Sequence, residues 1–400
     1  MTDVWLSLVL DIACLSLSFV FFWSTAVVLV GLLKPAARHP AAARKLRFAV
    51  LVCARNEQDV ISRPVKSVKM SSYPADCREV IVIADNCTDA TAERARAAGA
   101  TVWEKTTPSA GKGDALAWGV ERVVKAGGFD AIAVFDADNV ASAEWFSSVN
   151  DALCDGETVV TGRRHASNAS ANVVSGWYAV YWDMMNELSN RVRTNLSLSA
   201  KLTGTGFAFL VSSLRGGEWK TSTMVEDVEF TVQVNLGGGR VAYVPEADYA
   251  DEQPESFRYM WRQLRRWTTG GWQVVRRYFL PWLGGLRRAP SLRLFDCFFA
   301  ILTGMSVAFI HLFNMGAFVA KTCGGASALA AGRFFLGVFG FIFLMGWFTA
   351  VSSVALSQAK RRPKASSVLT FPIFSLILSA AVLYSLVRPT RSWKPIPHGG

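Results

Sequence analysis

The sequence has few charged residues. Its cysteines and histidines also lack the spacing that is typical of a zinc site or of a disulfide framework. Only 18% of its 400 residues are Asp, Glu, Lys or Arg, whereas ~25% is typical of soluble domains, and 51% are hydrophobic. The seven cysteines lack paired zinc spacing and a secreted disulfide pattern, and the four histidines do not cluster. These absences argue against a secreted disulfide-rich domain and a zinc protein, and the composition predicts that part of the chain lies in lipid.

Long apolar runs lie at the two ends of the chain. Residues 4–33 can cross ~30 Å of hydrocarbon at ~1.5 Å per residue and lack a small-residue cleavage site, so we expect an uncleaved anchor within residues 1–34. Three further runs are found at about 294–320, 331–357 and 368–388. They predict a small bundle of membrane helices within residues 291–390, and four crossings in all.

Basic residues flank the apolar runs and contribute to the net charge of +11. They follow the first run, precede the second and follow the third, which predicts that these loops are cytosolic. Anionic headgroups explain them, so we expect membrane lipids and no nucleic acid as partners. Four crossings would place the tail 391–400 and the nearby Arg388 outside, against the same rule. Either the tail lies outside despite its basic residues, or one of the apolar runs does not simply cross the membrane.

Residues 45–255 alternate short apolar runs with helical stretches. The runs FAVLVCA (48–54), EVIVIAD (79–85) and AIAVFD (131–136) have the length and composition of buried strands. This alternation predicts βαβ units, and therefore a cytosolic α/β domain with a mostly parallel sheet. Ligands of such sheets bind beyond the carboxyl ends of the strands, so we expect the site at that edge.

Polar residues follow each of these three runs. Asp136 and Asp138 are two residues apart at a strand end, a spacing that points both to the same side of a strand. Two such carboxylates can hold a hard divalent cation and, through it, a diphosphate. A solvated strand end is the simpler interpretation of an Asp-x-Asp pair, but the buried run directly before it favours a site. The other polar residues expected at this edge are Asn56, Glu57 and Asp85.

Glu226 and Asp227 open a predicted helix downstream of the glycine-rich segment KLTGTGFAFL (201–210). Complementarity to the helix dipole would by itself explain the two acids. The glycines, however, allow the backbone to approach a substrate closely, and the combination indicates the base end of an active site. Lys112 lies between two glycines at the start of another helix, which is a weak signal for phosphate and not a Walker loop.

The segment Trp261–Tyr278 carries five arginines and four aromatic residues, so we expect residues 256–290 to form interface helices along the membrane surface. Contact with headgroups explains most of these side chains. Gln263, Arg266 and Trp267 are three and four residues apart and share one helix face. That face can present an amide, a guanidinium for phosphate and an indole for a sugar ring.

In this order, the motifs resemble those of the large glycosyltransferase family with the GT-A fold, which includes cellulose, hyaluronan, chitin and poly-N-acetylglucosamine synthases and ceramide glucosyltransferase. The resemblance covers about residues 48–270. Together the ordered motifs are very specific. They are CARNE (53–57) and IADNCTDAT (83–91) for the nucleotide, GKGDAL (111–116) for the lysine loop, FDAD (135–138) for the metal, VED (225–227) for the general base and QLRRW (263–267) for the Q-x-x-R-W signature.

For the donor, the resemblance implies a UDP-sugar whose nucleotide contacts Asp85 and Lys112. Asp138 would bind Mg²⁺ or Mn²⁺, which would bridge the diphosphate. The family often has two adjacent aspartates at the second strand end, whereas this sequence has Ala84 before Asp85. Asp85 would then recognise the base alone or share that role with Asp89.

For the acceptor, the resemblance implies an inverting reaction in which Asp227 deprotonates the attacking hydroxyl. Arg266 and Trp267 would hold the diphosphate and the acceptor sugar. The pocket of the acceptor would be lined by Gly204, Thr205 and Gly206. The neighbouring Asn56, Glu57, Asp136, Glu226 and Gln263 are assigned to the substrate and nucleotide site.

Three functions remain open for a multi-pass protein of the cell membrane. The leading hypothesis is a processive polysaccharide synthase that elongates a polymer and passes it through the helical bundle. The second is a single sugar transfer to a membrane lipid, which the same motifs and anchors would serve. A nonenzymatic membrane receptor with a nucleotide-binding domain is the least favoured.

Overall fold

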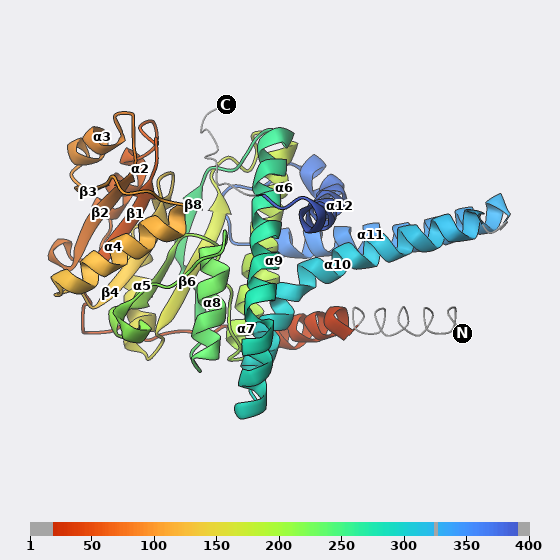
Figure 1. The fold of residues 1–400 in the computed structure, drawn as a ribbon, viewed down its shortest axis with the longest axis horizontal. Helices are drawn as coiled ribbons and strands as arrows, with labels where there is room; N and C mark the ends of the chain where they lie inside the picture. Colours follow the sequence, from red (N-terminus) through yellow and green to blue (C-terminus); the bar gives the residue numbers. More distant parts are fainter. Residues whose placement is uncertain (1–18, 324–326, 391–400) are drawn as a thin grey trace.

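The computed structural model describes residues 19–323 and 327–390, which form an α/β domain followed by long helices (Figure 1). The expected anchor at 4–33 is therefore described only from Phe19 onward, as the helix Phe19–Leu33. The expected tail 391–400 lies outside the described residues.

One eight-stranded sheet forms the centre of the α/β domain, in the order β3-β2-β1-β4-β7-β6-β8-β5. Four pairings are parallel (β1 with β2, β1 with β4, β2 with β3, β6 with β8) and three are antiparallel. This confirms the expected α/β class with a mostly parallel sheet. The strands are β1 Phe48–Ala54, β2 Arg78–Asp85, β3 Thr101–Lys105, β4 Ala131–Asp136, β5 Val140–Ala141, β6 Val159–Ala166, β7 Phe207–Leu210 and β8 Val241–Asp251.

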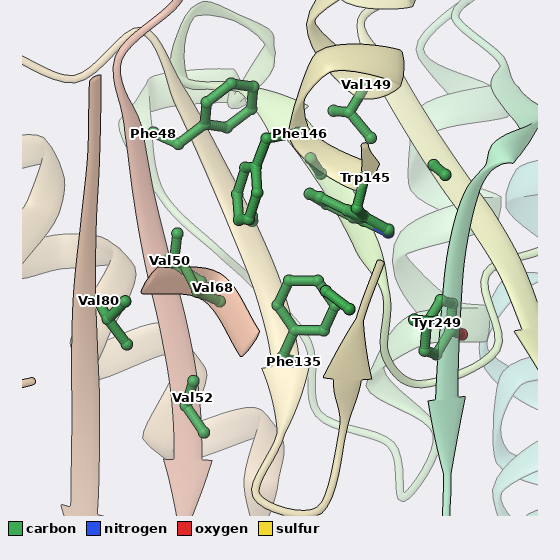
Figure 2. Close-up of a cluster of buried hydrophobic side chains, with 14 of the residues drawn as sticks. Phe48, Val50, Val52, Val68, Val80, Phe135, Trp145, Phe146, Val149 and Tyr249 are labelled. Atoms are coloured by element: carbon green, nitrogen blue, oxygen red, sulfur yellow. The ribbon is translucent and has the colours of Figure 1, made fainter. Parts of the chain in front are cut away.

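Helices cover both faces of this sheet, which is why the central strands are apolar on both sides. On the face covered by α2, α3 and α5, Phe48 and the rings of Phe135 and Trp145, 4.7 Å apart, belong to one cluster (Figure 2). On the other face, α4 and α8 pack against a cluster that includes Leu116 and Trp219. The two clusters make the sheet a rigid support for the polar residues at its carboxyl edge.

Two of the predicted site residues lie in the first turn of a helix. Lys112 is the first residue of α4, and Glu226 is the first residue of α8. Between β6 and β7 the chain forms α6, a π-helical segment at Met185–Arg191 and α7, a region that stands beside the sheet (Figure 1). The helices are α2 Ser62–Lys69, α3 Thr91–Ala97, α4 Lys112–Ala126, α5 Trp145–Cys154, α6 Val173–Met184, α7 Val192–Asn195 and α8 Glu226–Leu236.

A single helix of 32 residues, α9 (Phe257–Arg288), follows the α/β domain. The hydroxyl of Ser256 caps it by accepting a hydrogen bond from the Tyr259 N–H at 3.3 Å. One face of α9 is buried against the rest of the protein and the remainder is rich in arginine, as in an interface helix.

Three apolar helices complete the described chain: α10 Leu292–Cys323, α11 Ala328–Leu356 and α12 Ala365–Val387. By length and composition each contains a segment able to cross a membrane, at Leu292–Gly316, Phe339–Leu356 and Ala365–Val387. Helices α10 and α11 extend far from the sheet, whereas α12 stays beside α9 (Figure 1). The long apolar runs of the sequence are therefore helical, but they are not arranged alike.

Candidate active site

A cavity of about 370 Å³ lies at the carboxyl edge of the sheet, between the strand ends and helices α6, α8 and α9. Residues Ile301, Gly304 and Met305 of α10 and Leu378 and Val382 of α12 extend its wall. Most of the site residues predicted from sequence line it, namely Glu57, Asp85, Lys112, Asp136, Asp138, Gly204, Glu226, Asp227, Gln263, Arg266 and Trp267. The fold thus brings together motifs that are up to about half the chain apart.

Asp85 lies at the end of β2 and is almost fully buried. Its Oδ2 accepts a hydrogen bond from Arg55 Nη2 at 2.7 Å, and its Oδ1 accepts one from Asn86 Nδ2 at 2.8 Å. Asp89, the other candidate for base recognition, instead accepts from the Gln58 N–H at 3.2 Å. Asp85, and not Asp89, lines the cavity.

Lys112 links three parts of the site. Its Nζ contacts Asp136 Oδ1, donates to the Gly204 carbonyl at 2.6 Å and lies 3.9 Å from Glu226 Oε1. Burial alone would lower the pKa of Lys112, but the carboxylates of Asp136 and Glu226 outweigh it and raise that pKa. Lys112 is therefore a permanent cation at the first turn of α4, as a phosphate site requires.

Asp136 and Asp138 both line the cavity, but the expectation that both lie on the strand is wrong. Strand β4 ends at Asp136, so Asp138 lies in the following turn and not on the strand. The Asn139 side chain closes this turn by accepting from the Asp136 N–H at 2.9 Å. Asp138 Oδ2 accepts from the Glu252 N–H at 3.2 Å, which ties the turn to the end of β8.

The carboxylates of Asp136 and Asp138 fit a hard divalent cation in their chemistry and position. Among residues 19–323 and 327–390 no group of three His, Cys, Asp or Glu side chains forms a complete cage. Mg²⁺ usually binds through one or two carboxylates and takes its other ligands from phosphate and water. An Asp pair beside the cation Lys112 is compatible with that requirement.

Glu226 and Asp227 in the first turn of α8 are both buried, at 6% and 9% exposure. Burial raises the pKa of Glu226 to about 7 and raises that of Asp227 above its usual range, while Lys112 and Arg266 oppose the shift in both. Gly204 has a φ of +93°, and a Cβ there would lie 3.9 Å from Asp227 Oδ2. That contact is ordinary, so the positive φ, and not lack of space, favours glycine at this position.

Three predicted site residues lie outside the cavity wall. Asn56 is exposed, with a φ of 58°, and accepts from the Thr88 N–H at 2.8 Å, so it holds the loop after β2. Thr205 is fully buried and its hydroxyl accepts from the Asp136 N–H at 2.9 Å. Gly206 faces the ring of Tyr249, where a side chain would clash. These three residues therefore contact neighbouring parts of the protein and do not line the cavity.

The predicted face of α9 points into the cavity. Arg266 donates to the Met224 carbonyl at 3.4 Å, close to the start of α8. The ring of Trp267 is stacked on Tyr181 with centres 6.0 Å apart, and its edge meets Trp182 of α6 at 5.7 Å. This aromatic surface is suited to the apolar face of a sugar.

Sequence reasoning missed the contribution of β6 and of the end of β8. Arg164 of β6 is buried, lies 3.8 Å from the ring centre of Trp182 and donates to Asp251 Oδ2 at 3.0 Å. Gln253 follows β8 and also lines the cavity. The arginine pair at 163–164 within a strand was the one available signal, because charged residues rarely occupy a buried strand without a partner.

The fold and this arrangement of side chains define a glycosyltransferase of the GT-A class. The structure is similar to the mannosyltransferase PcManGT from Pyrobaculum calidifontis in complex with GDP-Man and Mn²⁺, over 94% of this chain and 99% of that one, with a TM-score of 0.64. At 16% sequence identity this similarity shows the fold.

The model of the family described as "Glycosyltransferase like family 2" matches residues 45–270, more than half of the chain, and the chain belongs to this family. It is 27% identical over 265 residues to the probable glycosyltransferase YdaM of Bacillus subtilis. It is 24% identical over 258 residues to the poly-beta-1,6-N-acetyl-D-glucosamine synthase of Staphylococcus aureus. Each match covers 63% of this chain, and 62% and 61% of these relatives respectively.

Proposed function

We propose that this glycosyltransferase moves a sugar from a UDP-sugar to a hydroxyl of a membrane-associated acceptor, with inversion at the anomeric carbon. The observation that carries the proposal is a single cavity lined by the base candidate Asp227, the cation Lys112 and the carboxylates of Asp136 and Asp138. A base and a charge-stabilised leaving group on one cavity are the two requirements of direct displacement.

In the proposed reaction, Asp227 takes the proton of the acceptor hydroxyl. The hydroxyl oxygen attacks the anomeric carbon while the bond from this carbon to the diphosphate oxygen breaks, and the electron pair leaves with the diphosphate. Lys112 and Arg266 stabilise the charge that develops there. A divalent cation bound at Asp138 would add neutralising charge to the same leaving group. Attack from the opposite face converts an α-linked donor into a β-linked product.

The residues of the cavity wall favour the proposal that the acceptor is held at the membrane. Ile301 and Met305 of α10 and Leu378 of α12 belong to helices long and apolar enough to enter a bilayer. The proposed multi-pass location, with the α/β domain in the cytosol, follows from these helices and from the basic loops that flank them. A soluble acceptor would not need these apolar contacts.

Repeated transfer to a growing polysaccharide is our leading proposal for the product, and the Staphylococcus aureus synthase among the relatives supports it. A single transfer to a membrane lipid is the second candidate, because the apolar residues of α10 and α12 offer space for a lipid chain. Product length separates the two: a polymer supports the first and one added sugar supports the second.

The donor is tested by screening UDP-sugars for release of the nucleotide by the purified full chain with Mn²⁺. GDP-mannose belongs in the screen because the structural relative was described with GDP-Man and Mn²⁺. We expect one UDP-sugar to be turned over and EDTA to stop the reaction. Turnover of GDP-mannose alone would contradict the UDP assignment, and no turnover of any nucleotide sugar would contradict the proposed function.

A further inference from the structure

Four side chains on the cavity wall carry buried polar atoms that have no hydrogen-bond partner among the described residues. Both amide atoms of Gln253 belong to this group, although the residue is only 3% exposed. Buried polar groups nearly always have a partner, because leaving one unpaired costs free energy. On a cavity wall, such atoms indicate a ligand that completes the hydrogen bonds. The other three atoms are Trp182 Nε1, Gln263 Oε1 and Asp251 Oδ1.

The backbone of Gln253 is fixed on both sides. Its N–H donates to Asn168 Oδ1 at 3.0 Å, and its carbonyl accepts from Asn168 Nδ2 at 2.9 Å. The N–H of the preceding Glu252 donates to Asp138. The loop therefore holds the Gln253 side chain on the cavity wall, which is the preorganisation that selective binding requires.

Gln253 lies next to Glu252, whose N–H donates to Asp138, but its strand is distant in the sheet from β2, which ends at Asp85. It follows β8, which the strand order places four positions from β1. Arg164 connects this region to α6, because it pairs with Asp251 and lies over the ring of Trp182. Gln253 and Trp182 thus border the acceptor end of the cavity and not the end that contains Asp85.

The chemistry of this region is that of a sugar site. The Gln253 amide offers N–H donors and a carbonyl acceptor, and the indole of Trp182 offers an N–H donor. The nearby rings of Tyr181 and Trp267 provide an apolar surface for the C–H face of a pyranose. The Asp251 carboxylate is already in an ion pair. We propose that Gln253 and Trp182 bind hydroxyl groups of a neutral pyranose unit of the acceptor.

This proposal rests on the proposed function and narrows the acceptor to one that carries a neutral sugar. It is tested with the full chain in detergent, using octyl glycosides of glucose, galactose, mannose and N-acetylglucosamine as acceptor probes. Nucleotide release gives the half-saturating concentration of each glycoside. Tryptophan fluorescence gives its binding without any turnover, so the subsite is tested even if the donor screen fails.

For Gln253→Ala and Gln253→Leu we expect the half-saturating and binding concentrations of the preferred glycoside to rise about tenfold, as for the loss of two hydrogen bonds. The melting temperature should not fall, because the Gln253 side chain makes no hydrogen bond within the described protein. The matched control is Gln358→Ala, an exposed glutamine that does not line the cavity and accepts a hydrogen bond from Arg163, and this variant should leave glycoside binding unchanged.

Unchanged glycoside binding in both Gln253 variants would overturn the proposal, and so would a wild-type chain that binds no glycoside. A raised KM for the donor with unchanged glycoside binding would overturn the acceptor assignment. Absence of nucleotide release from every donor, with normal glycoside binding that depends on Gln253, would instead refute the proposed function and leave the subsite standing.

Helix α12 supports a second, independent inference, because it is attached to the catalytic region at both ends. At its start, Lys364 donates to the Ala171 carbonyl at 3.2 Å, and just after its end the Arg388 carbonyl accepts from Arg265 of α9 at 2.9 Å. A helix of 23 residues is about 35 Å long, enough to separate the two ends by a whole bilayer if it crossed. In Figure 1, α12 is viewed nearly along its axis while α10 and α11 run across the picture.

We infer that α12 lies along the membrane surface instead of crossing it. Residues 388–390 are then on the same side as the α/β domain. This placement removes the conflict with the positive-inside rule, because Arg388 joins the basic residues of the other cytosolic loops. The apolar run at 368–388 is the one that is not a simple crossing.

Single cysteines on either side of α12, Lys360→Cys and Ser392→Cys, test this inference in a chain without native cysteines. An impermeant maleimide should label both in inside-out vesicles and neither in right-side-out vesicles. Labelling of the two positions from opposite sides would overturn the inference. An epitope tag at the same positions, read by antibody access, repeats the test if the cysteine-free chain does not fold.

Discussion

The polar side chains at the two ends of the cavity differ in whether they have partners within the protein. At the end formed by β1, β2 and β4, the charges are paired within the protein, Asp85 with Arg55 at 2.7 Å and Asp136 with Lys112. At the end formed by β6, β8 and α6, the amide of Gln253 is buried without a partner in the described chain. The first end is lined by ion pairs, whereas at the second end the ion pair of Arg164 with Asp251 is accompanied by a neutral amide that has no partner among the described residues.

We propose that this difference reflects what each end binds. A buried charge without a counter-charge costs far more than a buried neutral amide, so a site for a charged diphosphate must be paired before the ligand arrives. When the diphosphate binds, the charged side chains of the site exchange their partners within the protein for the diphosphate. A site for neutral hydroxyls can leave its amide open, and the ligand binds by supplying the missing partner.

The largest effect is expected from Arg164→Met, which breaks the ion pair beneath the acceptor end. The variant leaves Asp251 buried and without its partner, and removal of one member of a buried pair costs about 3–5 kcal/mol. A clear fall in the melting temperature of the detergent-solubilised protein would show this. The control Arg163→Met removes a neighbouring, more exposed side chain, and an equal fall in both variants would contradict the prediction.

Lys112→Met should damage the nucleotide end selectively. Removal of one group that stabilises developing charge lowers kcat by about 10²–10³-fold. Calorimetric titration should also show weaker binding of the nucleoside diphosphate, whereas glycoside binding should be retained. The control is Lys125→Met, whose exposed ammonium pairs with Glu121 one helical turn away. Normal nucleotide binding by the Lys112 variant would refute the role of this lysine.

Trp267→Leu should damage the acceptor end selectively. Loss of an aromatic contact of about 0.5–1.5 kcal/mol raises the half-saturating acceptor concentration about tenfold at most. Nucleotide binding should not change. Trp261→Leu, on the same helix but outside the cavity wall, is the matched control. A Trp267 variant that loses nucleotide affinity instead would remove the distinction between the two ends.

The smallest expected effect is on the pH profile. Burial raises the pKa of Glu226 to about 7 and that of Asp227 above the usual ~3.9 for aspartate. A base works only when deprotonated, so kcat/KM should fall as the pH drops through the raised pKa, at a higher pH than for an ordinary aspartate. The limb should persist in Glu226→Gln if Asp227 is the base. An acid limb at the pH of an ordinary aspartate would contradict the raised pKa.

The nucleotide end was largely predictable from the sequence. Strands β1 and β4 occupy the predicted residues 48–54 and 131–136, because buried strands of parallel sheets are continuous apolar runs. The polar residues at their ends needed only the rule that ligands bind at the carboxyl edge. Local sequence was sufficient because each motif directly follows its strand.

The acceptor end was not predictable in the same way. Strand β6 contains Arg163 and Arg164, and β8 contains several acids, so neither has the apolar run of a buried strand. Their charges are accommodated by partners distant in sequence, such as Asp251 for Arg164. Tertiary pairing also explains why Thr205 supports the Asp136 backbone and does not line the pocket.

The central claim is tested most directly by Asp227→Asn, compared with the wild type in transfer and in donor binding. The account predicts that sugar transfer is abolished while the nucleotide sugar still binds with nearly normal affinity, because the amide cannot accept the acceptor proton but keeps the shape of the site. Substantial transfer by this variant would contradict the assignment of Asp227 as the base.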